Sequence, residues 1–129
     1  MRERVNACKA PLMYSASMAS LHSTAGLPSL NEMREAVKER FGFFPCTWQL
    51  KAALMQLKQN DLVTLAPTGS GKTLTFWILL LFNEDGISII VTPLKVLGEK
   101  NVAELSLVSI LAINLTTSSA SDGIFKVLH

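Results

Sequence analysis

The chain has 129 residues, a length that allows one small domain at most. Its hydrophobic content of 49% is enough to fill a core and excludes a disordered tail. The net charge of +2 is too small to indicate a nucleic-acid partner by itself, although residues 1–60 carry eight Lys or Arg against four acids. The longest apolar run, residues 76–82, is far too short to span a bilayer, so we expect no membrane partner.

The cysteines and histidines suggest no covalent or metal framework. Cys8 and Cys46 are the only cysteines, and they show no paired spacing. Because His22 and His129 are also far apart in sequence, we expect neither a zinc site nor a disulfide. This pattern favours a reducing compartment, and we expect a nuclear or cytoplasmic location.

Capping residues predict where the first two helices begin and where the first one ends. Residues 1–28 show no sustained hydrophobic period, which predicts a flexible leader before a domain over residues 29–129. Ser29 followed by Glu32 has the pattern of a capping box, and Gly42 can end the helix that follows. Thr47 can cap a second helix, with leucines recurring on one face.

A glycine-rich loop then separates an expected strand, residues 62–66, from an expected helix, residues 73–82, and this order is the arrangement that wraps backbone N–H groups around a polyphosphate. The loop residues expected to bind the nucleotide are Pro67, Thr68, Gly69, Ser70, Gly71, Lys72 and Thr73. Its glycines leave room for converging amides, Lys72 places a charge near the β- and γ-phosphates, and Thr73 offers a hydroxyl to Mg²⁺. We therefore predict ATP and Mg²⁺ as cofactors; the alternative is a chance Gly-Ser loop.

The hydrophobic pattern of the rest of the chain predicts alternating strands and helices. The helix over residues 73–82 is apolar on every side, as expected for a helix buried against a sheet. Residues 87–91 and 110–115 are predicted as strands, and residues 94–107 as a helix interrupted at Gly98; a further helix is expected to begin at Asp122. This alternation predicts an α/β fold with about three parallel strands, preceded by two helices.

The loop sequence Ala-Pro-Thr-Gly-Ser-Gly-Lys-Thr resembles that of superfamily 2 helicases, the DEAD/DEAH-box and RecQ-like enzymes. Two other segments agree with this resemblance: Phe41-Gly42, Phe44-Pro45 and Gln49 upstream, and Thr92-Pro93-Leu94-Lys95 downstream. The resemblance covers about residues 30–129 and leans toward RecQ-like enzymes of fungal type, because Leu-Thr-Phe-Trp follows the loop. It implies the N-terminal part of a RecA-like P-loop NTPase domain with three layers. Ala66 departs from the general phosphate-loop pattern, which begins with Gly, and Cys46 stands where the RecQ pattern usually has Arg.

The resemblance also implies roles for residues outside the loop. Gln49 would hydrogen-bond the adenine edge, and Phe41 or Phe44 would stack on the base. The alternative is that Gln49 is an exposed helix residue and the phenylalanines are core. Thr92, Pro93 and Lys95 would lie against the phosphates of single-stranded nucleic acid, which we expect to be DNA rather than RNA. The alternative is that Thr92-Pro93 only ends a strand and that Lys95 is a solvated charge.

The catalytic set that such a helicase needs is incomplete in this sequence. An Asp-Glu pair after a later strand and arginines from a second domain would be required. The one pair of adjacent acids, Glu84-Asp85, falls in a predicted turn before the second expected strand, and we expect no second domain to follow. We therefore expect a truncated fragment in which only Lys72 and Thr73 contribute to catalysis, without helicase activity on its own. A P-loop small-molecule kinase and a non-catalytic nucleotide-binding relic are the alternatives, and the oligomeric state is left open.

Overall fold

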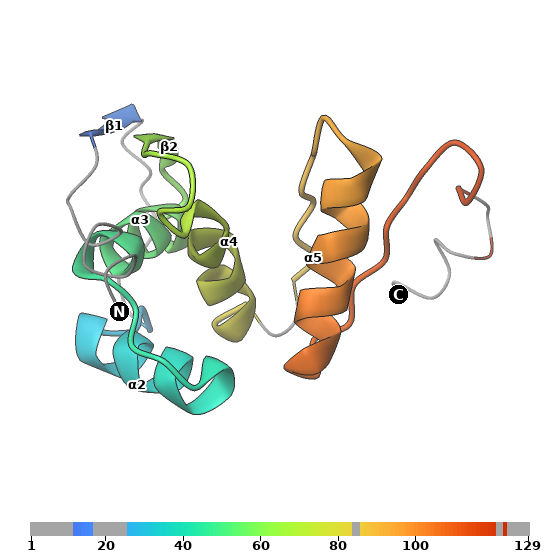
Figure 1. Ribbon diagram of the computed structural model, residues 1–129. Coiled ribbons are helices and arrows are strands. Elements are labelled where there is room, and N and C mark those ends of the chain that lie inside the picture. The colour runs from blue at the N-terminus through green and yellow to red at the C-terminus, as the bar shows by residue number, and fades with distance from the viewer. Residues whose placement is uncertain (1–11, 17–25, 84–85, 121–122, 124–129) are drawn as a thin grey trace. The chain divides into compact units, whose positions relative to one another are not determined.

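The computed structural model describes residues 12–16, 26–83, 86–120 and 123. The chain divides into two units, residues 1–86 and 87–129. Figure 1 shows the elements of the described residues, of which only α5 belongs to the second unit. In chain order they are β1 (Leu12–Ala16), α2 (Leu30–Phe41), α3 (Thr47–Leu57), β2 (Asp61–Leu65), α4 (Lys72–Leu81) and α5 (Lys95–Leu107).

Helix α2 begins and ends where the sequence predicts. The Ser29 hydroxyl accepts the Glu32 N–H at 3.2 Å, and the Glu32 carboxylate accepts the Ser29 N–H at 2.6 Å, so the capping box is confirmed. Hydrogen bonding to the carboxylate, from the Ser29 backbone N–H first and from the Ser29 side chain second, holds the pKa of the Glu32 carboxyl below its ordinary value. At the other end Gly42 adopts a φ of +80° and donates its N–H to the Lys38 carbonyl, the left-handed cap that glycine favours.

Helix α3 begins at Thr47, but its N-cap is Cys46 rather than the predicted Thr47. The Cys46 N–H donates to Oε1 of Gln49 at 2.8 Å. Gln49 is the third residue of the helix, so this bond is the one that a Glu or Gln side chain accepts from the N-cap in a capping box. Cys46 is disulfide-bonded, which contradicts the expectation that the cysteines would form no disulfide. The cysteines therefore lend no support to a reducing compartment.

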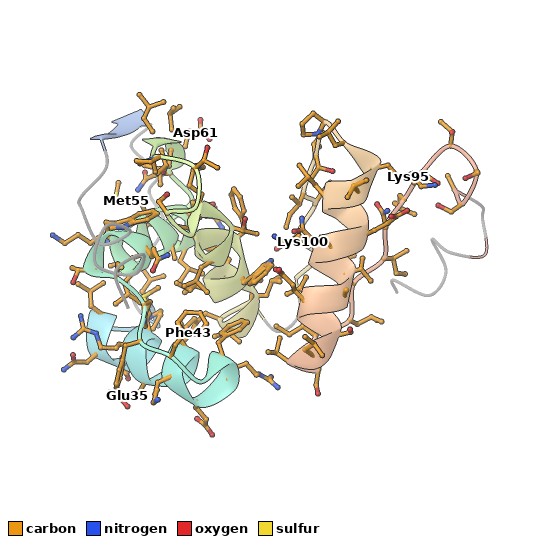
Figure 2. All side chains as sticks on the ribbon, in the orientation of Figure 1. Glu35, Phe43, Met55, Asp61, Lys95 and Lys100 are labelled. Carbon is orange, nitrogen blue, oxygen red and sulfur yellow. The ribbon has the colours of Figure 1, made fainter. Side chains whose placement is uncertain are left out.

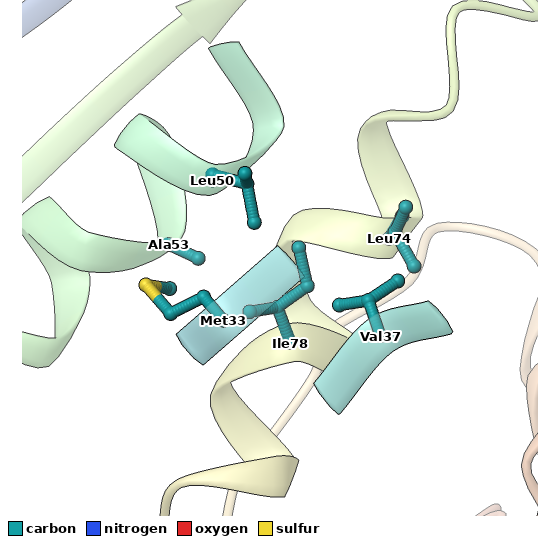
Figure 3. Close-up of a cluster of buried hydrophobic side chains, with 6 residues drawn as sticks. All are labelled: Met33, Val37, Leu50, Ala53, Leu74 and Ile78. Carbon is teal, nitrogen blue, oxygen red and sulfur yellow. The ribbon is translucent and has the colours of Figure 1, made fainter. Parts of the chain in front are cut away.

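The core of the first unit lies between three helices. Its buried side chains point toward one another in Figure 3: Met33 and Val37 from α2, Leu50 and Ala53 from α3, and Leu74 and Ile78 from α4. Only one stripe of α4 is buried, and that stripe packs with side chains of α2 and α3. Phe76 on the same helix is 41% exposed, so α4 lies at the surface of a helical core and not, as expected, buried against a sheet. None of the helices in the described part of the chain has the length and apolar character needed to cross a membrane.

The sheet differs from the prediction. Within the described residues it has two antiparallel strands, with Tyr14 of β1 opposite Val63 of β2, in place of about three parallel ones. The stretch expected to be a leader thus contributes β1. Val63 and Leu65 are 59% and 55% exposed, so the face of β2 that carries them is not covered. A parallel strand in a three-layer fold is covered on both faces.

In the second unit only the helix is confirmed. Helix α5 runs through Gly98 without the expected interruption. Residues 87–91 and 110–115 form no strands within the described part, and Ile89 and Val91 are 86% and 91% exposed. A strand needs a neighbouring backbone to satisfy its N–H and C=O groups, and neither segment has such a neighbour among the described residues. The helix expected from Asp122 lies outside those residues, Gly123 excepted.

Candidate functional site

The loop between β2 and α4 is folded back on itself, as predicted. The Ser70 N–H donates to the Pro67 carbonyl at 3.2 Å, which closes a turn. Gly69 and Gly71 have φ values of +79° and +81°, a region that side-chain-bearing residues rarely enter. The two glycines are therefore the residues that allow this loop to reverse direction before α4.

Backbone donors at the start of α4 are available to a ligand. Among the described residues, the N–H groups of Gly69, Gly71, Lys72 and Thr73 have no acceptor, and the Leu74 N–H is the first to bond, to the Gly71 carbonyl at 3.2 Å. The first N–H groups of any helix lack intrahelical partners, and the helix dipole is positive at this end. The start of α4 thus presents amides that favour an anion.

Lys72 closes the loop with its side chain. Its Nζ lies 2.8 Å from the Ala66 carbonyl oxygen and 2.8 Å from that of Pro67. Because an ammonium group carries three N–H donors, one of them remains for another acceptor. The half-buried Thr73 follows in the first turn of α4, where its hydroxyl could reach a metal ion held by phosphates.

Ser70 provides a buried hydroxyl within the loop. The residue is only 5% exposed, and its Oγ has no hydrogen-bond partner among the described residues. A buried hydroxyl without a partner is costly unless a ligand satisfies it. The hydroxyl, the amides and the ammonium group all donate hydrogen bonds, so the residues present fit the oxygen-rich phosphates of ATP.

Gln49 joins α3 to the loop. Its Nε2 donates to the Gly71 carbonyl at 2.9 Å, while its Oε1 accepts the Cys46 N–H at 2.8 Å. The side chain is 5% exposed, so the alternative of an exposed helix residue is wrong. Both ends of the amide bind protein groups here, and the contact between Gln49 and adenine stays a prediction.

The two phenylalanines proposed to stack on a base lie in different surroundings. The Phe41 ring stacks on Trp77, with centroids 6.1 Å apart and an angle of 17° between the planes, and it packs against the core. Phe44 is 59% exposed, and the Lys38 ammonium lies 5.2 Å from its ring centroid. Phe44 is therefore the one of the pair with a ring face open to a ligand.

The residues expected to contact a nucleic-acid strand belong to the second unit. The Thr92 hydroxyl donates to the Leu94 carbonyl at 3.3 Å, and Pro93 is exposed. Lys95, labelled in Figure 2, is the first residue of α5, and its Nζ lies 3.7 Å from the Glu99 carboxylate in an exposed pair. The structure thus brings Gln49 to the loop, while the role of Thr92, Pro93 and Lys95 stays a prediction.

Sequence reasoning missed two contributions to the site. Ala66 stands where the general phosphate-loop pattern has Gly, yet it acts through its carbonyl oxygen, which an alanine supplies as well as a glycine. The link from Cys46 to Gln49 was also missed, although a spacing of three residues at a helix start is the signal of a capping box.

The two loop glycines give a matched pair of variants. A Cβ at Gly71 would lie 2.5 Å from Nε2 of Gln49, whereas one at Gly69 would meet nothing within 4 Å. Gly69→Ala should cost about 1 kcal/mol for its left-handed backbone, and Gly71→Ala should cost more because it also displaces Gln49. Urea unfolding of both variants measures the difference, and equal losses would show that Gln49 does not pack against Gly71.

The chain was compared with known proteins. A search of curated proteins and a search of solved structures both found no match. A family model described as DEAD/DEAH box helicase matches residues 46–124, which is more than half of the chain and includes Gln49 and the whole loop. The chain therefore belongs to the DEAD/DEAH box helicase family.

Proposed function

We propose that this chain is the ATP-binding and nucleic-acid-binding part of an ATP-dependent DNA helicase of RecQ-like type. Membership of the family implies a RecA-like α/β fold, and it implies ATP, a divalent metal and nucleic acid as ligands. The observation that carries the proposal is the loop before α4, where backbone N–H groups without acceptors stand beside the Lys72 ammonium and the buried Ser70 hydroxyl.

Each loop residue has a distinct part in the proposed site. The amides of Gly69, Gly71 and Lys72 hold phosphate oxygens, and the Lys72 ammonium neutralises their charge near the β- and γ-phosphates. The Thr73 hydroxyl holds the Mg²⁺ that accompanies ATP. When bound, ATP supplies the phosphoanhydride bond whose hydrolysis drives a helicase. An exposed Phe44 offers its ring to the base, and Gln49 is the proposed adenine contact.

The second unit supplies the proposed contacts with the nucleic-acid strand. Thr92, Pro93 and Lys95 are exposed or half-exposed, and hydroxyl and ammonium groups suit phosphate contacts that do not read sequence. The RecQ-like assignment, and with it DNA as the strand, rests on Leu-Thr-Phe-Trp after Thr73. The printed sequence has no adjacent acid pair after Asp85, so we propose that the chain binds ATP without unwinding DNA on its own.

Binding and turnover measured on the same preparation test this proposal. The full chain is titrated with a fluorescent ATP analogue in the presence of Mg²⁺, and separately with single-stranded DNA and with RNA of the same sequence. ATP hydrolysis is then measured with and without each strand. We expect saturable nucleotide binding, tighter binding of DNA than of RNA, and no strand-stimulated hydrolysis, since an arginine finger alone contributes about 10³–10⁵ in rate. Absence of nucleotide binding would contradict the site, and robust turnover would contradict the incomplete catalytic set.

A further inference from the structure

We infer that Gln49 is a positioning residue that holds the phosphate loop in its binding form through the Gly71 carbonyl, independently of any contact with a nucleobase. This inference rests on the proposed function, because it concerns the same loop. It assigns Gln49 an effect on every polyphosphate ligand, whether or not a base is attached.

The hydrogen bonds of Gln49 fix it at both ends. Its Oε1 accepts the Cys46 N–H at 2.8 Å at the start of α3, and its Nε2 donates to the Gly71 carbonyl at 2.9 Å. The side chain is 5% exposed and thus held within packed protein. Gln49 thereby connects the start of α3 to the loop before α4 through hydrogen bonds.

The Gly71 carbonyl is the group whose direction matters most for anion binding. It also accepts the Leu74 N–H at 3.2 Å, so two donors fix its orientation. In a trans peptide the C=O of one residue and the N–H of the next point in opposite directions, and the described chain has no cis peptide. Holding the Gly71 carbonyl toward Gln49 therefore turns the Lys72 N–H to the opposite side, away from protein acceptors and toward an incoming phosphate.

The close approach of the two residues leaves no room for a side chain at position 71 unless Gln49 moves. A Cβ built there would lie 2.5 Å from Nε2 of Gln49, inside any acceptable contact distance. The amide thus occupies the space that a side chain at position 71 would need. The bonds to Cys46 and Gly71 use one of the two acceptor sites on Oε1 and one of the two N–H donors on Nε2, so the positioning role does not depend on what the remaining sites bind.

Gln49→Glu separates positioning from base recognition. A carboxylate keeps the acceptor for the Cys46 N–H but loses the donor to Gly71 and places an oxygen against its carbonyl. We expect Mg²⁺-tripolyphosphate to bind the variant about tenfold more weakly for one lost buried hydrogen bond, and Mg²⁺-ATP to be weakened by at least the same factor. Gln56→Glu makes the same chemical change on α3, away from the loop, and should leave both affinities unchanged.

The pH dependence of the Gln49→Glu variant provides a readout that a merely structural defect would not give. Burial and the facing carbonyl raise the pKa of a carboxyl group at this position above its ordinary value. When protonated, that group can again donate to Gly71. The ratio of wild-type to variant tripolyphosphate affinity should therefore fall as the pH is lowered from about 8 to about 5.5, whereas the ratio for Gln56→Glu should stay constant.

Hydrogen exchange of the ligand-free chain tests the inference without any ligand. The Leu74 amide, which bonds to Gly71, should exchange about tenfold faster in Gln49→Glu than in the wild type or Gln56→Glu. Unchanged Leu74 exchange would overturn the inference, and so would loss of ATP affinity with tripolyphosphate affinity unchanged, which would make Gln49 a base-recognition residue. If the wild type binds neither ligand, the proposed function fails and the exchange rates still decide the role of Gln49.

Discussion

Lys72→Ala should weaken the binding of Mg²⁺-ATP by about 10- to 100-fold, the equivalent of one hydrogen bond between charged groups. The variant removes the ammonium that we propose neutralises the phosphates. It also removes the bonds of 2.8 Å that hold the Ala66 and Pro67 carbonyls. Two losses therefore act together: the positive charge, and the side chain that keeps the loop closed. Fluorescence titration with an ATP analogue measures the change.

A matched lysine shows whether the effect belongs to the loop. Lys58 caps the C-terminal end of α3 and is exposed, so Lys58→Ala changes the net charge equally without touching the site. We expect this control to bind ATP as the wild type does. If Lys72→Ala kept the wild-type affinity, the loop would not be the phosphate site.

Ile78→Ala should lower the free energy of unfolding of the first unit by about 2–5 kcal/mol. Ile78 is 0% exposed and packs with Met33, Val37 and Leu50 from the two neighbouring helices. Ile78 lies among side chains of α2 and α3 (Figure 3). Its truncation removes those apolar contacts and is expected to leave a cavity in the core. Urea denaturation followed by circular dichroism measures the loss.

Two variants calibrate this result. Ile78→Val removes one methylene and should cost about 0.5–1.5 kcal/mol. Phe76→Ala on the same helix removes a larger side chain that is 41% exposed, and it should cost less than Ile78→Ala. An Ile78→Ala loss no greater than that of Phe76→Ala would show that the three helices do not form the core of the unit.

Helices were predicted well because their signals are local. Ser29, Glu32 and Gly42 lie within one helix length of each other, and the hydrogen bonds that they form involve only their own helix. The loop before α4 was likewise predictable, since its two glycines, lysine and threonine lie within the five residues 69–73. These signals depend on residues three or four positions apart and need no knowledge of the rest of the fold.

The sheet was not predicted because strand pairing is non-local. Residues 87–91 have the composition of a buried strand, yet composition does not say which backbone would pair with them. Leu12–Ala16 lacks a clear alternation of apolar and polar residues, and its pairing with β2 joins segments nearly fifty residues apart. The contact of Gln49 with Gly71 is missed for the same reason, since those residues are 22 positions apart.

We propose that the start of α4 and the loop before it hold phosphate through main-chain amides. NMR of the uniformly ¹⁵N-labelled chain during titration with Mg²⁺-ATP measures each amide separately. We predict that the amide signals of Gly69, Gly71, Lys72 and Thr73 shift most, saturably, and that in Lys72→Ala the shifts of the remaining loop amides need about 10- to 100-fold more Mg²⁺-ATP. A chain that stays folded while these four signals do not move, or while the largest shifts lie elsewhere, would contradict the account.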